Sequence, residues 1–168
     1  MTKTAVLTLR TQNAQKTHEL GMRFASLLNP GAILGLKGEL GAGKTTFIKG
    51  LCAGLGVEEK VVSPTFVLMH LYKGKIPVYH FDLYRLEPKD FVDLGWDEYL
   101  EGNGVSVLEW IDRAHGNFPF SFLEIAIEYG EKSDERRFFF TPHGKTTPWL
   151  EKLLKELNDK VLFLQDVK

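Results

Sequence analysis

The sequence has little of several features that mark whole classes of protein. Its single cysteine, Cys52, leaves no partner for a disulfide within the chain and no cysteine metal cluster, and we expect the thiol to fill space in the core. No run approaches the roughly 20 apolar residues of a membrane span, and we expect no secretion signal. The net charge of -1 gives no global cationic field for nucleic acid. These features favour a cytoplasmic protein.

Size and composition are those of an ordinary globular chain. Apolar residues make up 43% of the sequence and charged residues 26%. We find no internal repeat, low-complexity tract or long linker. A length of 168 residues favours one core, so we expect residues 1–168 to form a single domain.

The strongest motif is a phosphate-binding loop of the form G-x-x-x-x-G-K-[ST]. Glycines let backbone amides turn toward a polyphosphate, a lysine adds charge for the outer phosphates, and a hydroxyl can ligate Mg²⁺. The apolar run before the loop predicts a buried strand, and the segment after it predicts a helix whose N-terminus faces the anion. The predicted nucleotide-binding residues are Gly38, Glu39, Leu40, Gly41, Ala42, Gly43, Lys44, Thr45 and Thr46.

Apolar patterns predict strands and helices that alternate in the first half of the chain, followed by antiparallel pairs. The expected fold class is therefore α/β: a three-layer P-loop NTPase whose mixed sheet has a parallel centre and antiparallel additions. Strands are expected at Ala5–Leu9, Ala32–Leu36, Phe66–Tyr72, Ile76–Phe81, Val105–Leu108, Phe122–Tyr129 and Arg137–Thr141. Helices are expected at Thr17–Leu28, from Thr45 to Gly54, at Pro88–Leu94 and over Trp149–Leu157.

Ligands of such sheets bind beyond the carboxyl ends of the strands, so polar groups there are candidate site residues. Glu109 directly follows the strand at Val105–Leu108, and we expect it to hold nucleotide-bound Mg²⁺ directly or through water, opposite Thr45. Trp110 beside it is interpreted as a packing residue, with stacking on a nucleotide as the alternative.

A second candidate group lies in the segment His80-Phe81-Asp82-Leu83-Tyr84-Arg85. His80, Asp82 and Tyr84 share one face of a strand because side chains alternate. Asp82 can orient a water or hold Mg²⁺ through its water shell, or instead form a salt bridge with Arg85. His80 is interpreted as a structural histidine, and Arg85 as a ligand for phosphate or for an acidic partner surface.

A third candidate group is the hydroxyl pair Ser63 and Thr65, on a rigid loop after the phosphate-loop helix. Segments at this place in nucleotide switches are ordered by the γ-phosphate and Mg²⁺ and released on hydrolysis. An ordinary turn with hydroxyl-to-backbone bonds is the alternative.

These pieces, in this order, resemble the TsaE family of small P-loop ATPases of bacterial tRNA threonylcarbamoyladenosine biosynthesis. The likeness runs from Thr17 to Gly144. Its specific parts are Ser63-Pro64-Thr65-Phe66, the His80–Arg85 segment, Leu94-Gly95 and Glu109-Trp110. Phe118, where the family usually has leucine, and the aromatic run Phe138–Phe140 depart from the pattern without touching the expected chemistry.

The resemblance implies that the nucleotide is ATP, with Thr45 and Glu109 on Mg²⁺ and Asp82 near the hydrolytic water. It implies that turnover supports threonylcarbamoyl transfer to N6 of adenosine 37 in tRNAs that read ANN codons, with the transfer itself on the partner proteins TsaB and TsaD. In the family an arginine near the nucleotide precedes the last strand, and Arg136 and Arg137 both fit that position.

The expected reaction converts ATP and water to ADP and phosphate, with Lys44, Asp82 and Glu109 as the catalytic residues. No self-contained general base is evident, so we expect slow turnover alone and faster turnover with partners. A small-molecule kinase is the main rival, but the arginines form no lid-like cluster. A GTPase lacks support because no Asn-Lys-x-Asp segment is present. An assembly factor that binds ATP and rarely hydrolyses it stays open, because binding and turnover use the same residues.

Overall fold

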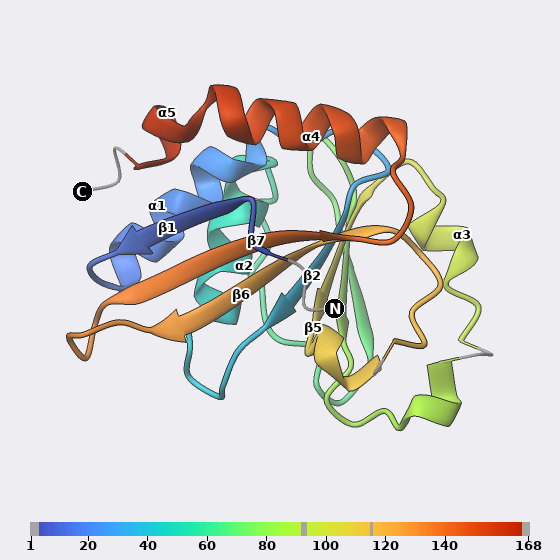
Figure 1. Cartoon of the computed structure of the whole chain (residues 1–168). Helices are drawn as coiled ribbons and strands as arrows, with labels where there is room; N and C mark the ends of the chain where they lie inside the picture. The colour runs from blue at the N-terminus through green and yellow to red at the C-terminus, as the bar shows by residue number, and fades with distance from the viewer. Residues whose placement is uncertain (1–3, 92–93, 115, 166–168) are drawn as a thin grey trace.

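A seven-stranded sheet organises the part of the chain that the computed structural model describes, residues 4–91, 94–114 and 116–165 (Figure 1). The strands are β1 (Leu7–Thr11), β2 (Ile33–Lys37), β3 (Met69–Tyr72), β4 (Val78–Asp82), β5 (Val105–Glu109), β6 (Phe122–Tyr129) and β7 (Arg136–His143). The α-helices are α1 (Ala14–Ala25), α2 (Lys44–Gly54), α3 (Asp97–Leu100), α4 (Pro148–Asp159) and α5 (Val161–Gln165), and two 3₁₀ helices span η1 (Pro88–Phe91) and η2 (Ile111–Ala114).

The strand order is β1-β7-β6-β2-β5-β4-β3. Strand β2 runs parallel to both of its neighbours, β5 and β6, and β4 runs parallel to β5. The outer pairs β6–β7, β1–β7 and β3–β4 are antiparallel. This mixed sheet, with a parallel centre and antiparallel additions, confirms the predicted fold class.

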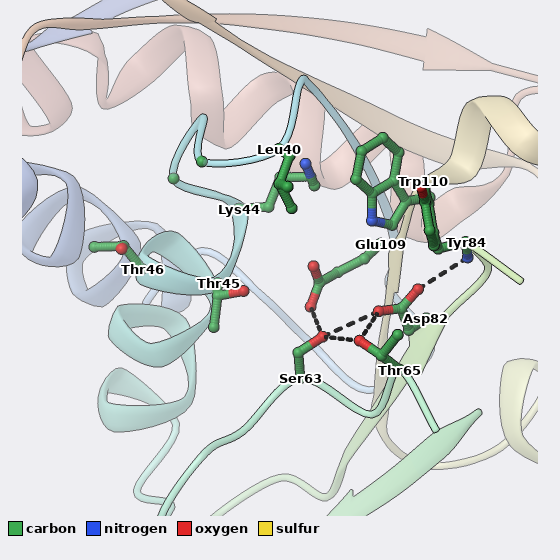
Figure 2. Close-up of a pocket in the computed structure, with 12 residues that line it drawn as sticks. Leu40, Lys44, Thr45, Thr46, Ser63, Thr65, Asp82, Tyr84, Glu109 and Trp110 are labelled. Atoms are coloured by element: carbon green, nitrogen blue, oxygen red, sulfur yellow. Dashed lines mark hydrogen bonds between the residues drawn. The ribbon is translucent and has the colours of Figure 1, made fainter. Parts of the chain in front are cut away.

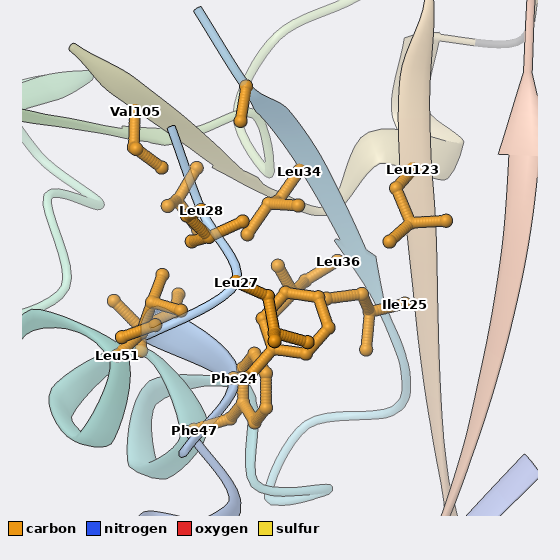
Figure 3. Close-up of a cluster of buried hydrophobic side chains, with 14 of the residues drawn as sticks. Phe24, Leu27, Leu28, Leu34, Leu36, Phe47, Leu51, Val105, Leu123 and Ile125 are labelled. Atoms are coloured by element: carbon orange, nitrogen blue, oxygen red, sulfur yellow. The ribbon is translucent and has the colours of Figure 1, made fainter. Parts of the chain in front are cut away.

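Apolar side chains cover both faces of the sheet. Leu34 and Leu36 of β2 belong to a cluster formed with α1, α2 and α4, and Figure 3 shows its part around α1 and α2. Ile33, which points the other way along the same strand, belongs to a second cluster with α3 and η2. The two clusters make the three layers that the sequence predicts. Cys52 is fully buried in the first cluster, and burial raises the pKa of its thiol to about 12, so its interpretation as a core residue is confirmed.

Helices α1 and α2 approach each other more closely than side chains would allow. A Cβ atom placed on Gly50 of α2 would overlap the carbonyl oxygen of His18 in α1, and one on Gly21 would overlap the carbonyl oxygen of Phe47. Glycine at these two positions therefore sets the distance at which α1 packs against the phosphate-loop helix.

Helix boundaries follow capping groups more closely than the apolar pattern. Helix α1 begins three residues before the predicted Thr17, because the Asn13 side chain accepts a hydrogen bond from the backbone of Lys16. Helix α4 begins at Pro148 behind the capping residue Thr147 and covers the predicted stripe.

The strand expected at Ala5–Leu9 lies two residues later, at Leu7–Thr11, and helix α1 ends at Ala25 rather than at the expected Leu28. Two further predictions of local structure were wrong. The strand expected from Phe66 begins only at Met69, because residues 65–67 form a turn and Leu68 has a left-handed φ of 71°. The helix expected at Pro88–Leu94 is a 3₁₀ turn that ends at Phe91, and positions 92 and 93 lie outside the described residues. The short helix α3 was not predicted. None of the described helices is both long enough and apolar enough to cross a membrane.

Candidate functional site: a phosphate loop facing two carboxylates

The loop between β2 and α2 has a backbone that requires glycine. Gly41 and Gly43 have φ values of 80° and 108°, in the left-handed region that other residues rarely adopt. Gly43 is also the N-cap of α2 and offers no side-chain acceptor to the first amides of the helix. Those amides are therefore available to an external anion, and the helix dipole favours negative charge there.

The loop borders a cleft of about 420 Å³ (Figure 2). Most of the site residues predicted from the sequence line this cleft, and they come from four separate segments of the chain. They are Leu40, Gly41, Gly43, Lys44, Thr45, Thr46, Ser63, Thr65, Asp82, Tyr84, Glu109 and Trp110.

The ammonium group of Lys44 is held by the loop itself. Its Nζ donates to the carbonyl oxygens of Gly38 at 2.6 Å and Glu39 at 3.0 Å, and lies 3.9 Å from the centroid of the Trp110 ring. Burial lowers the pKa of Lys44, while the carboxylates of Glu109, Asp112 and Asp82 oppose that change. An anionic ligand in the cleft would stabilise the charged ammonium further.

Two buried carboxylates close the opposite side of the cleft. Asp82 ends β4 and Glu109 ends β5, and the two are register partners across these parallel strands, so both lie at the same edge of the sheet. Asp82 is 4% exposed and Glu109 is 3% exposed. Oxygen ligands in this arrangement suit Mg²⁺, which binds one or two carboxylates and takes its other ligands from phosphates and water.

The hydroxyl groups of Ser63 and Thr65 bond to these carboxylates rather than to backbone groups. Oδ2 of Asp82 accepts bonds from Ser63 Oγ at 3.0 Å and Thr65 Oγ1 at 2.9 Å, and Ser63 Oγ lies 3.4 Å from Glu109 Oε1 (Figure 2). Tyr72 anchors the start of the segment, since its hydroxyl donates to the Val62 carbonyl at 2.9 Å and accepts from the Val62 amide at 3.1 Å.

The other candidate residues of the His80–Arg85 segment, which are His80, Tyr84 and Arg85, lie in three different environments. His80 is fully buried, with Nε2 2.7 Å from Glu109 Oε1. The Tyr84 amide donates to Asp82 Oδ1 at 2.9 Å. Arg85 does not line the cleft, and its guanidinium carbon lies 4.3 Å from the centroid of the exposed Phe66 ring.

Trp110 forms the wall between the loop and the Tyr84 side chain. Its ring centroid lies 4.9 Å from that of Tyr84, and its backbone has a φ of 61°. The ring packs against Lys44 and Tyr84, as the packing interpretation expects, and it also lines the cleft.

Of the two candidate arginines, Arg136 contacts the phosphate loop. Its Nε donates to the Ala42 carbonyl at 2.9 Å and its Nη2 to the Gly41 carbonyl at 3.4 Å. The Arg137 guanidinium lies instead 3.5 Å from the carbonyl oxygen of Tyr129 and 4.0 Å from the Glu128 carboxylate.

Tyr129 was not selected from the sequence, yet its ring lies against Arg136 with 4.3 Å between guanidinium carbon and ring centroid. Its hydroxyl donates to the Leu40 carbonyl at 3.3 Å. Its position at the end of the expected strand Phe122–Tyr129 could have identified it, because Glu109 was identified from its position after a strand.

This geometry agrees with comparisons to known proteins. The family model described as "Threonylcarbamoyl adenosine biosynthesis protein TsaE" matches residues 11–138. The chain belongs to the TsaE family. The resemblance noted from the sequence is thereby confirmed.

Relatives in this family share most of their length with the chain. A Bacillus subtilis protein named "tRNA threonylcarbamoyladenosine biosynthesis protein TsaE" is 41% identical over 150 residues, covering 89% of this chain and 92% of the relative. A Treponema pallidum protein of the same name is 44% identical over 117 residues, covering 69% and 87%. The crystal structure of Bacillus subtilis YdiB superposes with a TM-score of 0.77 at 36% identity, covering 92% of this chain and 95% of that one. The relatives named TsaE are thus similar to this chain in sequence, and YdiB is similar to it in both sequence and fold.

Proposed function

We propose that this chain is a P-loop ATPase domain that binds ATP with Mg²⁺ in the cleft and hydrolyses it to ADP and phosphate. One observation carries the proposal: a loop that presents helix amides and the Lys44 ammonium faces the paired carboxylates of Asp82 and Glu109 across one cleft. Phosphoryl transfer needs positioning and charge stabilisation more than covalent chemistry, and this arrangement supplies both.

Each side of the cleft has a separate task in this proposal. The loop amides and Lys44 bind the phosphates, and Arg136 holds the loop in shape through the Ala42 and Gly41 carbonyls. Thr45 and Glu109 would hold Mg²⁺ directly or through water, since both offer the hard oxygen ligands that this ion prefers. The ion would neutralise charge that develops on the phosphate oxygens. Asp82 accepts a hydrogen bond from the hydrolytic water and orients it.

The names of the relatives support a biological role in tRNA threonylcarbamoyladenosine biosynthesis. We infer that ATP turnover by this chain supports cycles of threonylcarbamoyl transfer to N6 of adenosine 37, in cytoplasmic tRNAs that read ANN codons. The transfer takes place on the TsaB–TsaD complex, to which this chain binds. Contact with tRNA is indirect in this proposal, in keeping with a net charge of -1.

Four hydrogen bonds within the chain, made by Lys44 and Asp82, support slow turnover by the isolated protein. Lys44 Nζ is bonded to loop carbonyls, and Oδ2 of Asp82 already accepts two hydroxyls from the Ser63–Thr65 segment. These bonds compete with the contacts that Lys44 would make to phosphate and that Asp82 would make to water. A partner that moves this segment would therefore increase the rate.

The test is a steady-state ATPase assay in which TsaB, TsaD and tRNA are added one at a time, followed by a single-turnover measurement. We expect slow hydrolysis alone and a rate increase of at least about tenfold in the complex, which corresponds to ~1.4 kcal/mol of barrier. Equal rates with and without partners would contradict the partner dependence. Tight binding without single-turnover hydrolysis would instead show an ATP-dependent assembly factor.

Replacing Glu109 by alanine should lower turnover by about 10²-fold, because it removes a charged oxygen ligand from the magnesium side of the cleft. The measurement is the dependence of the ATPase rate on Mg²⁺ concentration. Glu131→Ala, which removes an exposed loop carboxylate, is the matched control and should leave the rate unchanged. Normal Mg²⁺ dependence in Glu109→Ala would show that the metal site was assigned to the wrong residue.

A further inference from the structure

A fully buried histidine lies behind the magnesium side of the cleft and does not line the cleft. His80 of β4 is 0% exposed, and its Nε2 lies 2.7 Å from Oε1 of Glu109. The other ring nitrogen, Nδ1, is buried and has no hydrogen-bond partner among the residues that the structure describes. Since an unpaired buried polar atom costs free energy, an apolar side chain at this position would be favoured by packing alone.

The register of the two strands places His80 beside the strand that ends in Glu109. Asp82 pairs with Glu109, whereas His80 pairs with Val107, which lies two residues before Glu109 on β5. The ring therefore approaches Glu109 from inside the sheet. Within the described chain, the hydrogen bonds to Glu109 from His80 and from Ser63, at 2.7 and 3.4 Å, both end on Oε1. Oε2 receives neither of these bonds.

We infer that His80 is a positioning residue for Glu109: its Nε2–H fixes Oε1 and thereby presents Oε2 to the magnesium ion of the bound nucleotide. This inference rests on the proposed function, because it assumes that Glu109 holds the ion. His80 does not line the cleft, so it would act on the ion only through Glu109. A hydrogen bond of this kind fixes the orientation of a ligating carboxylate, and loss of such a partner typically weakens metal affinity 10- to 100-fold.

The test separates magnesium affinity from nucleotide affinity in binding measurements that need no turnover. A fluorescent ATP analogue is titrated against each variant in EDTA, and Mg²⁺ is then titrated at fixed analogue concentration. His80→Leu keeps the bulk of the side chain but has no hydrogen-bond donor, so we expect its Mg²⁺ affinity to be about 10- to 100-fold weaker than that of the wild type. Its affinity for the nucleotide analogue in EDTA should stay within about twofold of the wild-type value. His80→Gln carries an amide N–H in place of Nε2–H and should recover most of the loss.

A matched control separates positioning from loosening of the strand. Val78→Ala opens a cavity on the same strand, two residues away and fully buried, without contacting the Glu109 hydrogen bond. It should lower the melting temperature and leave Mg²⁺ affinity unchanged. If Val78→Ala weakens Mg²⁺ affinity as much as His80→Leu does, the inference is overturned. In a Glu109→Ala background, His80→Leu should have no further effect on Mg²⁺ affinity, because the group that it positions is gone.

Unchanged Mg²⁺ affinity in His80→Leu would show that His80 only fills space in the core. That result would overturn the inference and leave the proposed function standing. A wild-type protein that binds no magnesium–nucleotide would overturn the proposed function, and the inference with it. If His80→Leu does not fold, His80→Asn takes its place, since its shorter amide does not extend to the Nε2 position. Asparagine with normal Mg²⁺ affinity would then overturn the inference, and weakened affinity would support it.

Discussion

Replacing Lys44 by alanine is expected to lower the rate of ATP hydrolysis by about 10²- to 10³-fold, which corresponds to ~2.7–4 kcal/mol of transition-state stabilisation. The variant loses the ammonium that faces the phosphates and keeps the loop glycines that shape the backbone. Lys44 is 5% exposed, and burial lowers its pKa below the ordinary 10.5. A lowered pKa means that folding disfavours the charged form, so removal of this charge should not lower the melting temperature through electrostatics.

The control for this variant is Lys49→Ala, which removes an exposed lysine from the same helix, α2. It should retain wild-type turnover and stability. Initial rates of ADP formation, measured for both variants with and without partners, decide the question. A Lys44→Ala protein that hydrolyses ATP at the wild-type rate would remove the loop from the proposed chemistry.

The second large effect is expected in stability, from Gly50→Ala. Alanine favours a helix interior over glycine by about 1 kcal/mol, which taken alone would stabilise α2. The added Cβ, however, overlaps the backbone carbonyl oxygen of His18, an atom that cannot turn away as a side chain would. We expect the overlap to dominate and to lower the free energy of unfolding by about 3 kcal/mol, seen as a melting temperature roughly 6–12 °C lower.

Ala53→Ser adds one atom to the exposed side of the same helix and is the control for this prediction. It should change the free energy of unfolding by less than about 0.5 kcal/mol. If Gly50→Ala is as stable as wild type, α1 and α2 can separate slightly without cost, and the close approach is not a requirement of the fold.

Local sequence patterns predicted the fold class and the residues around the cleft, because both depend on periodicity and on strand ends. Asp82 and Glu109 were selected for their positions after apolar strands, and parallel pairing brings them to one edge. The phosphate loop could be predicted because its sequence places glycine at left-handed φ angles, 80° at Gly41 and 108° at Gly43, which glycine adopts without the strain that other residues incur.

Features that depend on contacts between distant segments could not be predicted from local sequence patterns. Neighbouring arginines at 136 and 137 look alike in sequence, and only the alternation of β7 decides that Arg136 meets the loop. The bond from His80 to Glu109 required the register between two strands. Phe66–Leu68 have strand-like composition, but the Leu68 amide bonds to the Pro64 carbonyl at 2.9 Å and forms a turn instead.

The order of the sheet also bears on how the protein is made. Strand β2 carries the phosphate loop, yet its partners β5 and β6 begin only at Val105 and Phe122, and Arg136 follows later still. During translation the loop therefore leaves the ribosome long before either flanking strand exists. A nascent chain that ends before β6 presents an unpaired apolar edge of β2, the kind of surface that promotes aggregation and that chaperones bind.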